Sequence, residues 1–141
     1  MKRFLTILAA GLLTLLLTVP ALAQTWYPAN QKAIAWDPVT TMGGGAPLPA
    51  GSTVEYKIWI KGLVQTTPAL LGQTDKTEYT VSFTNEGKYF VGVQTVRLEA
   101  GAIVAESDIS WSDMADRVAN QQIFGIQYYQ APGHAGGIRP K

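Results

Sequence analysis

The sequence predicts an all-β protein, an antiparallel β-sandwich of six or seven short strands. Three observations lead to this fold class: alternating apolar residues between Thr77 and Ser112, glycine-containing turns between the alternating runs, and the lack of a convincing helix. Alternation with a period of two is typical of half-buried strands. The inward positions are Tyr79, Val81 and Phe83 in the first run, and Tyr89, Val91 and Val93 in the second.

The earlier part of the chain supplies the remaining strands. Lys32–Trp36 is expected to be a short strand with Ile34 and Trp36 inward, ending at Asp37-Pro38 because proline cannot pair in a ladder. The Gly- and Pro-rich residues 39–53 are expected to form an exposed loop. A weak strand near Trp26 and an irregular connection over residues 62–76, which could hold a short edge strand near Leu63–Gln65, complete this part of the expected fold.

Residues 54–61 form the clearest expected strand, because apolar and charged side chains alternate throughout it. A third strand of the later run is expected to end in Ser-Asp-Ile-Ser-Trp-Ser. Residues 114–120 could form one helical turn, which is too short to be stable alone. The expected inward residues of the clearest strand are Val54, Tyr56, Ile58 and Ile60, and the outward ones are Glu55, Lys57, Trp59 and Lys61.

The first 23 residues have the pattern of a secretory signal peptide. A basic start is followed by an apolar run of about 16 residues and by the small-residue site Ala21-Leu22-Ala23. The run is shorter than the ~20 residues of a spanning helix. Cleavage would leave 118 residues with nine basic and ten acidic side chains, a formal charge of −1. We therefore expect a secreted or periplasmic protein that binds no nucleic acid and has no membrane span after cleavage.

The order of motifs resembles a fibronectin type III domain. Trp36-Asp37-Pro38 is similar to the buried tryptophan and turn of that family, and Tyr56 to its third-strand aromatic. Residues 86–89, Glu-Gly-Lys-Tyr, resemble the family's tyrosine corner, and residues 106–110 its serine-bearing last strand. The resemblance implies an immunoglobulin-like sandwich over residues 24–113, followed by a C-terminal extension over residues 114–141, and a binding role without catalysis.

Catalytic and metal-binding chemistry is not expected. The chain has one histidine, His134, in a Gly-rich tail, and no cysteine, so neither a Ser-His nor a thiol mechanism is supported. Four acidic residues near the last strand do not match the spacing of a calcium loop. We expect no enzyme activity, no cofactor and no metal. The four acidic residues are Glu106, Asp108, Asp113 and Asp116.

Two surfaces are candidate binding sites. Trp59 is expected to point outward between two lysines, on the same sheet face as Phe90. The C-terminal run Ile123–Tyr129 has the composition of a strand that could join the sheet edge of another chain, or could dock on its own domain and cover that face. The candidate residues are Lys57, Trp59, Lys61, Phe90, Gln94, Phe124, Tyr128 and Tyr129.

These observations indicate a non-catalytic interaction module that binds another exported protein or self-associates through its tail, with a surface assembly as one setting. The alternative is a carbohydrate-binding accessory module that stacks sugar rings on Trp59 and Phe90.

Overall fold

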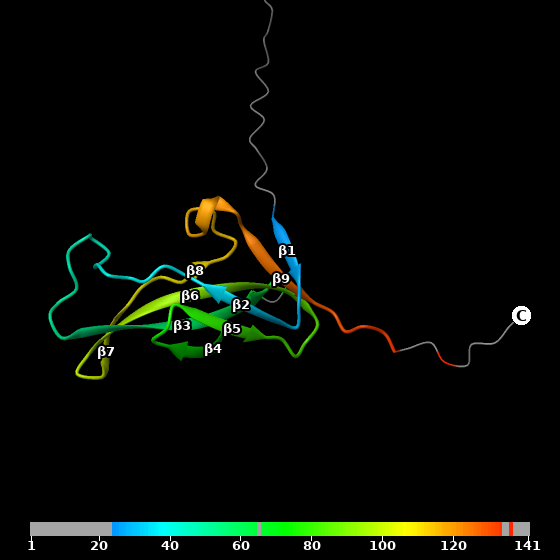
Figure 1. Cartoon of the computed structure of the whole chain (residues 1–141), viewed down its shortest axis with the longest axis horizontal. Helices are drawn as coiled ribbons and strands as arrows, with labels where there is room; N and C mark the ends of the chain where they lie inside the picture. Colours follow the sequence, from blue (N-terminus) through cyan, green and yellow to red (C-terminus); the bar gives the residue numbers. More distant parts are fainter. Residues whose placement is uncertain (1–23, 65, 134–135, 137–141) are drawn as a thin grey trace, which may run out of the picture.

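The computed structural model describes residues 24–64, 66–133 and 136, and it confirms the expected all-β sandwich. The signal peptide expected at residues 1–23 and the single histidine, His134, lie outside these ranges. A seven-stranded sheet packs against a two-stranded sheet (Figure 1). Across the residues described, no helix has the length and apolar character needed to span a bilayer.

The strands are β1 (Thr25–Pro28), β2 (Gln31–Ala35), β3 (Ser52–Gly62), β4 (Ala69–Thr74), β5 (Glu78–Ser82), β6 (Gly87–Glu99), β7 (Ala102–Glu106), β8 (Ser110–Trp111) and β9 (Phe124–Tyr128), with one 3₁₀ turn at Ala119–Gln121.

The larger sheet is built on β6. One edge of β6 pairs with β3 along the whole length of β3, and its other edge pairs in turn with β9, β8 and β7. Beyond these pairs, β4 extends the sheet next to β3, and β1 extends it next to β9. The smaller sheet consists of the antiparallel pair β2–β5. The expected last strand is therefore divided into β7 and β8.

Two serine side chains complete the edge of β6 at the junctions between its three partners. Between β9 and β8, the Val91 N–H donates to Ser112 Oγ over 3.1 Å, and between β8 and β7 the Thr95 N–H donates to Ser107 Oγ over 3.0 Å. The Val91 bond is buried and the Thr95 bond is exposed. A buried backbone N–H without a partner is costly, so the Ser112 hydroxyl is the more important of the two where three short strands follow one another on a single long edge.

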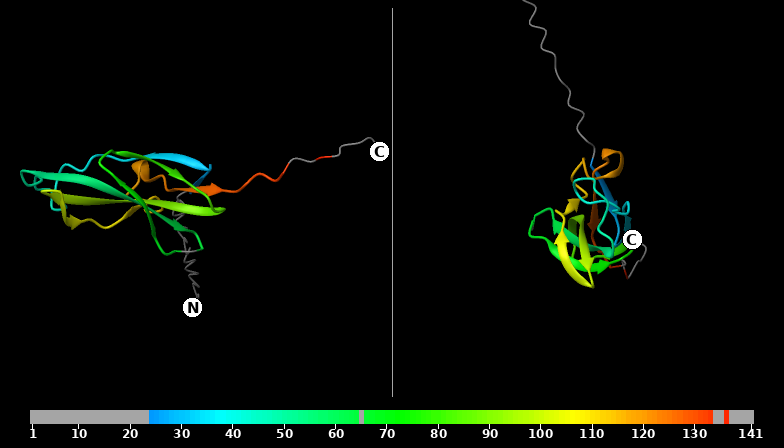
Figure 2. Two further views of the ribbon diagram at one scale, coloured as in Figure 1. Left: turned by 90° about the horizontal axis from the view of Figure 1, so that it is seen from below. Right: turned by 90° about the vertical axis from the view of Figure 1, so that its left-hand side faces the viewer.

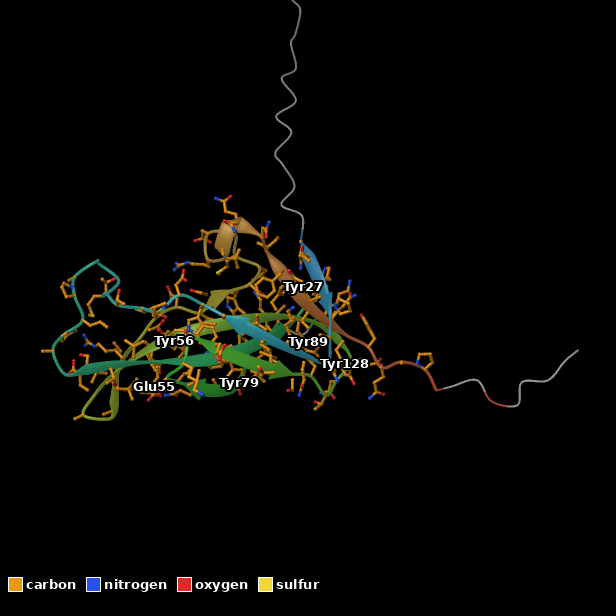
Figure 3. All side chains as sticks on the ribbon, in the orientation of Figure 1. Tyr27, Glu55, Tyr56, Tyr79, Tyr89 and Tyr128 are labelled. Carbon is orange, nitrogen blue, oxygen red and sulfur yellow. The ribbon has the colours of Figure 1, made fainter. Side chains whose placement is uncertain are left out.

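The core lies between the two sheets and is formed by the inward residues that the alternation predicts. Trp36 packs edge-on against Tyr56 with ring centroids 5.3 Å apart, and the Tyr56 hydroxyl accepts a hydrogen bond from the Val39 N–H. Figure 3 shows Tyr56, Tyr79 and Tyr89 along this layer. The buried cluster consists of Ile34, Tyr56, Ile58, Val81, Phe83, Val91 and Ile126.

Tyr89 has the hydrogen bond that a tyrosine corner requires. Its hydroxyl donates to the Asn85 carbonyl over 2.8 Å, and its ring stacks on Phe83 with centroids 4.9 Å apart. The ring therefore packs at the core while the hydroxyl remains paired with the turn before β6.

The C-terminal run is a strand of the domain, so the boundary expected at Asp113 falls inside the sheet. β9 lies between β6, to which it is antiparallel, and β1, to which it is parallel. Ile126 at its centre is fully buried, and the Trp26 ring lies over Gly125, where a Cβ would come within 2.3 Å of it. Of the two alternatives for this run, the structure shows docking on its own domain, but as a strand within the larger sheet and not as a cover over the face that carries Trp59.

Replacing Ser112 by alanine should lower the free energy of unfolding by about 1–3 kcal/mol, because it leaves the buried Val91 N–H without its acceptor. Urea denaturation measures the change. The matched control is Ser82→Ala, since the Ser82 hydroxyl accepts its bond from Gln31 at the exposed surface. Equal effects of the two substitutions would contradict the role given to Ser112.

Candidate functional site

The structure brings five of the predicted site residues onto one face of the larger sheet, the face away from the core. Lys57, Trp59 and Lys61 of β3 lie directly opposite Gln94, Gly92 and Phe90 of β6 in the ladder. Directly opposed residues of neighbouring strands share a sheet face. We call this surface the outer face.

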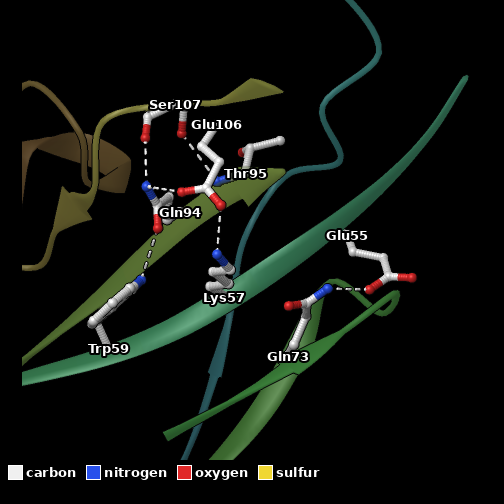
Figure 4. A network of polar contacts seen from close by, with 8 residues as sticks. All are labelled: Glu55, Lys57, Trp59, Gln73, Gln94, Thr95, Glu106 and Ser107. Atoms are coloured by element: carbon white, nitrogen blue, oxygen red, sulfur yellow. Dashed lines mark hydrogen bonds and ion pairs between the residues drawn. The ribbon is translucent and has the colours of Figure 1, made fainter. Parts of the chain in front are cut away.

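Polar side chains on the outer face are bound to one another. The Trp59 Nε1–H donates to Gln94 Oε1 over 3.1 Å, and Gln94 Nε2 donates to the Ser107 carbonyl over 2.8 Å (Figure 4). Lys57 forms an ion pair with Glu106. These contacts fix the Trp59 ring in position and tie the segment after β7 to the sheet.

Phe90 does not lie on the surface, which corrects the expectation of an exposed aromatic there. Its side chain is 6% exposed because the Trp26 ring packs against it, with centroids 5.4 Å apart, and the Lys61 ammonium lies over it, 5.5 Å from the ring centroid. Lys61 lies 4.6 Å from the Trp111 ring centroid and pairs with Asp113 over 2.9 Å. Phe90 therefore cannot act as a stacking platform for a ligand.

Gly92 allows the segment after β7 to approach the outer face closely. A Cβ at this position would lie 2.6 Å from Ile109 Cγ2 and 2.7 Å from Trp111 Cε3. The exposed apolar surface that remains here is small. It consists of the partly exposed Trp59 and of Leu70, which lies opposite Trp59 in the β3–β4 ladder and is 50% exposed.

Acidic residues near the last strands are used in ion pairs. Glu106 pairs with Lys57, Asp113 with Lys61, and Asp116 with its neighbour Arg117. Within the described ranges, no group of three acidic or histidine side chains is placed to hold a metal ion.

A groove lies at one end of the sandwich, between the β3–β4 connection and the turn from β5 to β6. Its volume is about 640 Å³. Several apolar residues around it are exposed: Leu63 at 50%, Val64 at 95% and Tyr129 at 60%. We call it the end groove, and its main apolar lining is Leu63, Val64, Leu71, Phe83, Tyr89 and Tyr129.

Packing between the two sheets explains where the end groove lies. At Gly72 the sheets are in contact, because a Cβ there would lie 2.7 Å from the Tyr79 hydroxyl. Toward the start of β4 this contact ends, and the side chains of Leu71 and Phe83 line the open space instead. The groove is therefore the part of the interface between the sheets that the described residues leave unfilled.

Of the predicted tail residues, only Tyr129 belongs to the end groove. Phe124 and Tyr128 are half-buried and pack against the core. Phe124 also packs edge-on against the Tyr27 ring, with the two ring centroids 6.1 Å apart. The groove was not expected from the sequence, because residues 62–76 were treated as an irregular connection with an edge strand near residues 63–65, whereas the structure places that strand, β4, at Ala69–Thr74. The adjacent apolar pair Leu63-Val64 in a turn was the available signal.

No family model, curated protein or solved structure matches the chain, so the assignment of function depends on these two surfaces.

Substituting Gly92 by alanine should destabilise the protein by about 1–3 kcal/mol, because the added methyl group overlaps Ile109 and the Trp111 ring. Gly43→Ala is the control, since nothing lies within 4 Å of a Cβ there, and its effect should be within about 0.5 kcal/mol. Chemical denaturation followed by tryptophan fluorescence compares the two. A Gly92→Ala protein as stable as the wild type would show that the covering segment is loosely packed.

Proposed function

We propose that this chain is an exported, non-catalytic protein-interaction module of the fibronectin type III kind, and that it binds an apolar segment of another exported protein in the end groove. The observation that carries the proposal is the groove itself. A volume of about 640 Å³ lies beside exposed Leu63, Val64 and Tyr129.

Exposed apolar surface of this kind needs a physical reason. Soluble proteins rarely leave large apolar patches in contact with water, and such patches usually mark interaction sites. Binding a partner's apolar side chains between Leu71 and Phe83 would continue the core outward, because both residues already pack at the interface between the sheets. Tyr129 adds an aromatic side chain, a type that is enriched at protein interfaces.

The end groove is a better protein site than the free edge of β4. The ladder between β3 and β4 changes register between Ile58 and Trp59, which leaves Leu71 unpaired. Such a bulge protects an edge strand against the addition of another strand. Side-chain insertion into the groove does not need a regular ladder.

Two further observations support the family and compartment that we propose. The Tyr89 hydroxyl bond to the Asn85 carbonyl and the packing of Trp36 on Tyr56 are contacts that a fibronectin type III domain would require. The N-terminal sequence, with its basic start and apolar run, supports export.

Carbohydrate binding is the second candidate, and the fixed Trp59 ring is the observation that favours it. Gln94 holds the indole beside Lys57 and Glu106, which could bind sugar hydroxyls. With Phe90 buried, one stacking ring remains rather than two. Fluorescence titration with soluble polysaccharides, comparing the wild type with Trp59→Phe, tests this candidate. A signal change that Trp59→Phe abolishes would support it, and equal responses would exclude Trp59 as the site.

Selection of random peptides displayed on phage tests the protein-binding proposal. The mature chain should enrich peptides with adjacent apolar residues, and Leu63→Lys should bind the enriched peptides at least about tenfold more weakly, a loss of about 1.4 kcal/mol or more. Met114→Lys is the matched control, because Met114 is 41% exposed and lies outside the groove lining. If no peptide is enriched, or if both variants bind equally, the groove is not the binding site.

A further inference from the structure

The end groove and a second exposed apolar feature lie at opposite ends of the molecule. β3 and β6 run antiparallel along the long axis, so that Gly62 and Gly87 lie at the groove end while Ser52 and Glu99 lie at the other end. The hairpin that β6 forms with β7 extends at this second end, far from the groove (Figures 1 and 2).

β7 carries apolar side chains that its own domain does not cover. All five of its residues are exposed, so neither face of the strand lies under another layer. Ile103 and Val104, adjacent in sequence, are 45% and 46% exposed. A tight turn with positive φ at Ala100 (49°) and Gly101 (81°) joins the strand to β6 and keeps it in the sheet. We call the segment from Glu99 to Glu106 the exposed hairpin.

The charges next to the exposed hairpin are compatible with its insertion into an apolar groove. Glu106 is paired with Lys57, and Glu99 with Arg97 over 3.5 Å. One acid and one lysine, Glu86 and Lys88, line the end groove, and the Lys88 ammonium lies over the Trp26 ring, 4.9 Å from its centroid. Because Glu99 and Glu106 already have partners, neither enters the groove as an unpaired charge, and the apolar pair Ile103 and Val104 supplies the contact.

We propose that two copies of this chain associate head to tail, with Ile103 and Val104 of one copy inserted into the end groove of the next. This inference rests on the proposed function, in which the groove binds an apolar protein segment, and identifies that segment as the exposed hairpin of a second copy. The hairpin cannot reach the groove of its own chain, because the two lie at opposite ends of β3 and β6.

Pairing between two β7 strands is the competing arrangement, and the structure disfavours it. The β6–β7 ladder shifts register between Arg97 and Leu98, which leaves Val104 without a partner in β6. A bulge interrupts the regular edge that a continuous sheet across two copies would need. Insertion into a groove uses side chains instead. Because the two contacting surfaces differ, each copy keeps one free end, and the association continues into a ring or a filament.

Sedimentation velocity of the mature chain over a range of concentrations tests this inference. We expect the wild type and the Met114→Lys control to form dimers and larger species as concentration rises. Val104→Lys, which changes the hairpin, and Leu63→Lys, which changes the groove, should each remain monomeric. Circular dichroism and thermal unfolding check that each variant is folded.

The decisive sample is an equimolar mixture of Val104→Lys and Leu63→Lys. The first variant keeps a wild-type groove and the second a wild-type hairpin, so the mixture should form dimers and nothing larger. Larger species in the mixture, or continued assembly of either variant alone, would overturn the head-to-tail arrangement.

A wild-type chain that stays monomeric at every concentration would overturn the inference without removing the proposed function, if the phage selection still yields groove-binding peptides. Failure of that selection together with normal assembly that Leu63→Lys does not affect would remove both.

Discussion

The larger sheet depends on one edge of β6, the edge that faces away from β3. This strand has thirteen residues, and no single partner on that side is long enough to pair with all of them. Three short strands, β9, β8 and β7, share the edge, and the hydroxyls of Ser112 and Ser107 accept the N–H groups at the two junctions. The serines lie where one partner strand gives way to the next, and the Ser112 hydroxyl supplies the acceptor that the buried Val91 N–H needs. The same pairing places β9, and through it β1, at the groove end of the sheet.

A difference in strand length between the layers explains the two exposed apolar ends. β3 and β6 have eleven and thirteen residues, whereas β2 and β5 have five each. The smaller sheet therefore covers only part of the larger one. Side chains near the covered part, such as Ile58 and Val81, are fully buried. Beyond it, Leu63 at one end and Ile103 at the other remain exposed, because the second layer does not extend over them in the part of the chain that the structure describes.

Local alternation was enough to predict which residues of β3, β5 and β6 face the core, since period-two patterning depends only on neighbours in the chain. It also placed Lys57, Trp59 and Phe90 correctly on one face. The burial of Phe90 could not be predicted, because Trp26 packs against it from a segment distant in sequence and Lys61 lies over its ring. For the same reason the apolar composition of residues 123–129 predicted a strand but not its neighbours. The end groove combines residues from three separate segments, and no local pattern reports such a combination.

Two of the edge strands, β4 and β7, carry bulges that disfavour pairing with a strand of another chain but still allow binding through side chains. β4 and β7 each carry one residue without a ladder partner, Leu71 and Val104. Such interruptions oppose the non-specific addition of strands at an open sheet edge. They do not reduce the exposed apolar area, and Leu70 and Val104 stay about half exposed. A chain that only needed to avoid aggregation could carry charges at these positions, as edge strands often do. Apolar side chains next to protected edges are better explained by a partner that recognises side chains within a shaped groove.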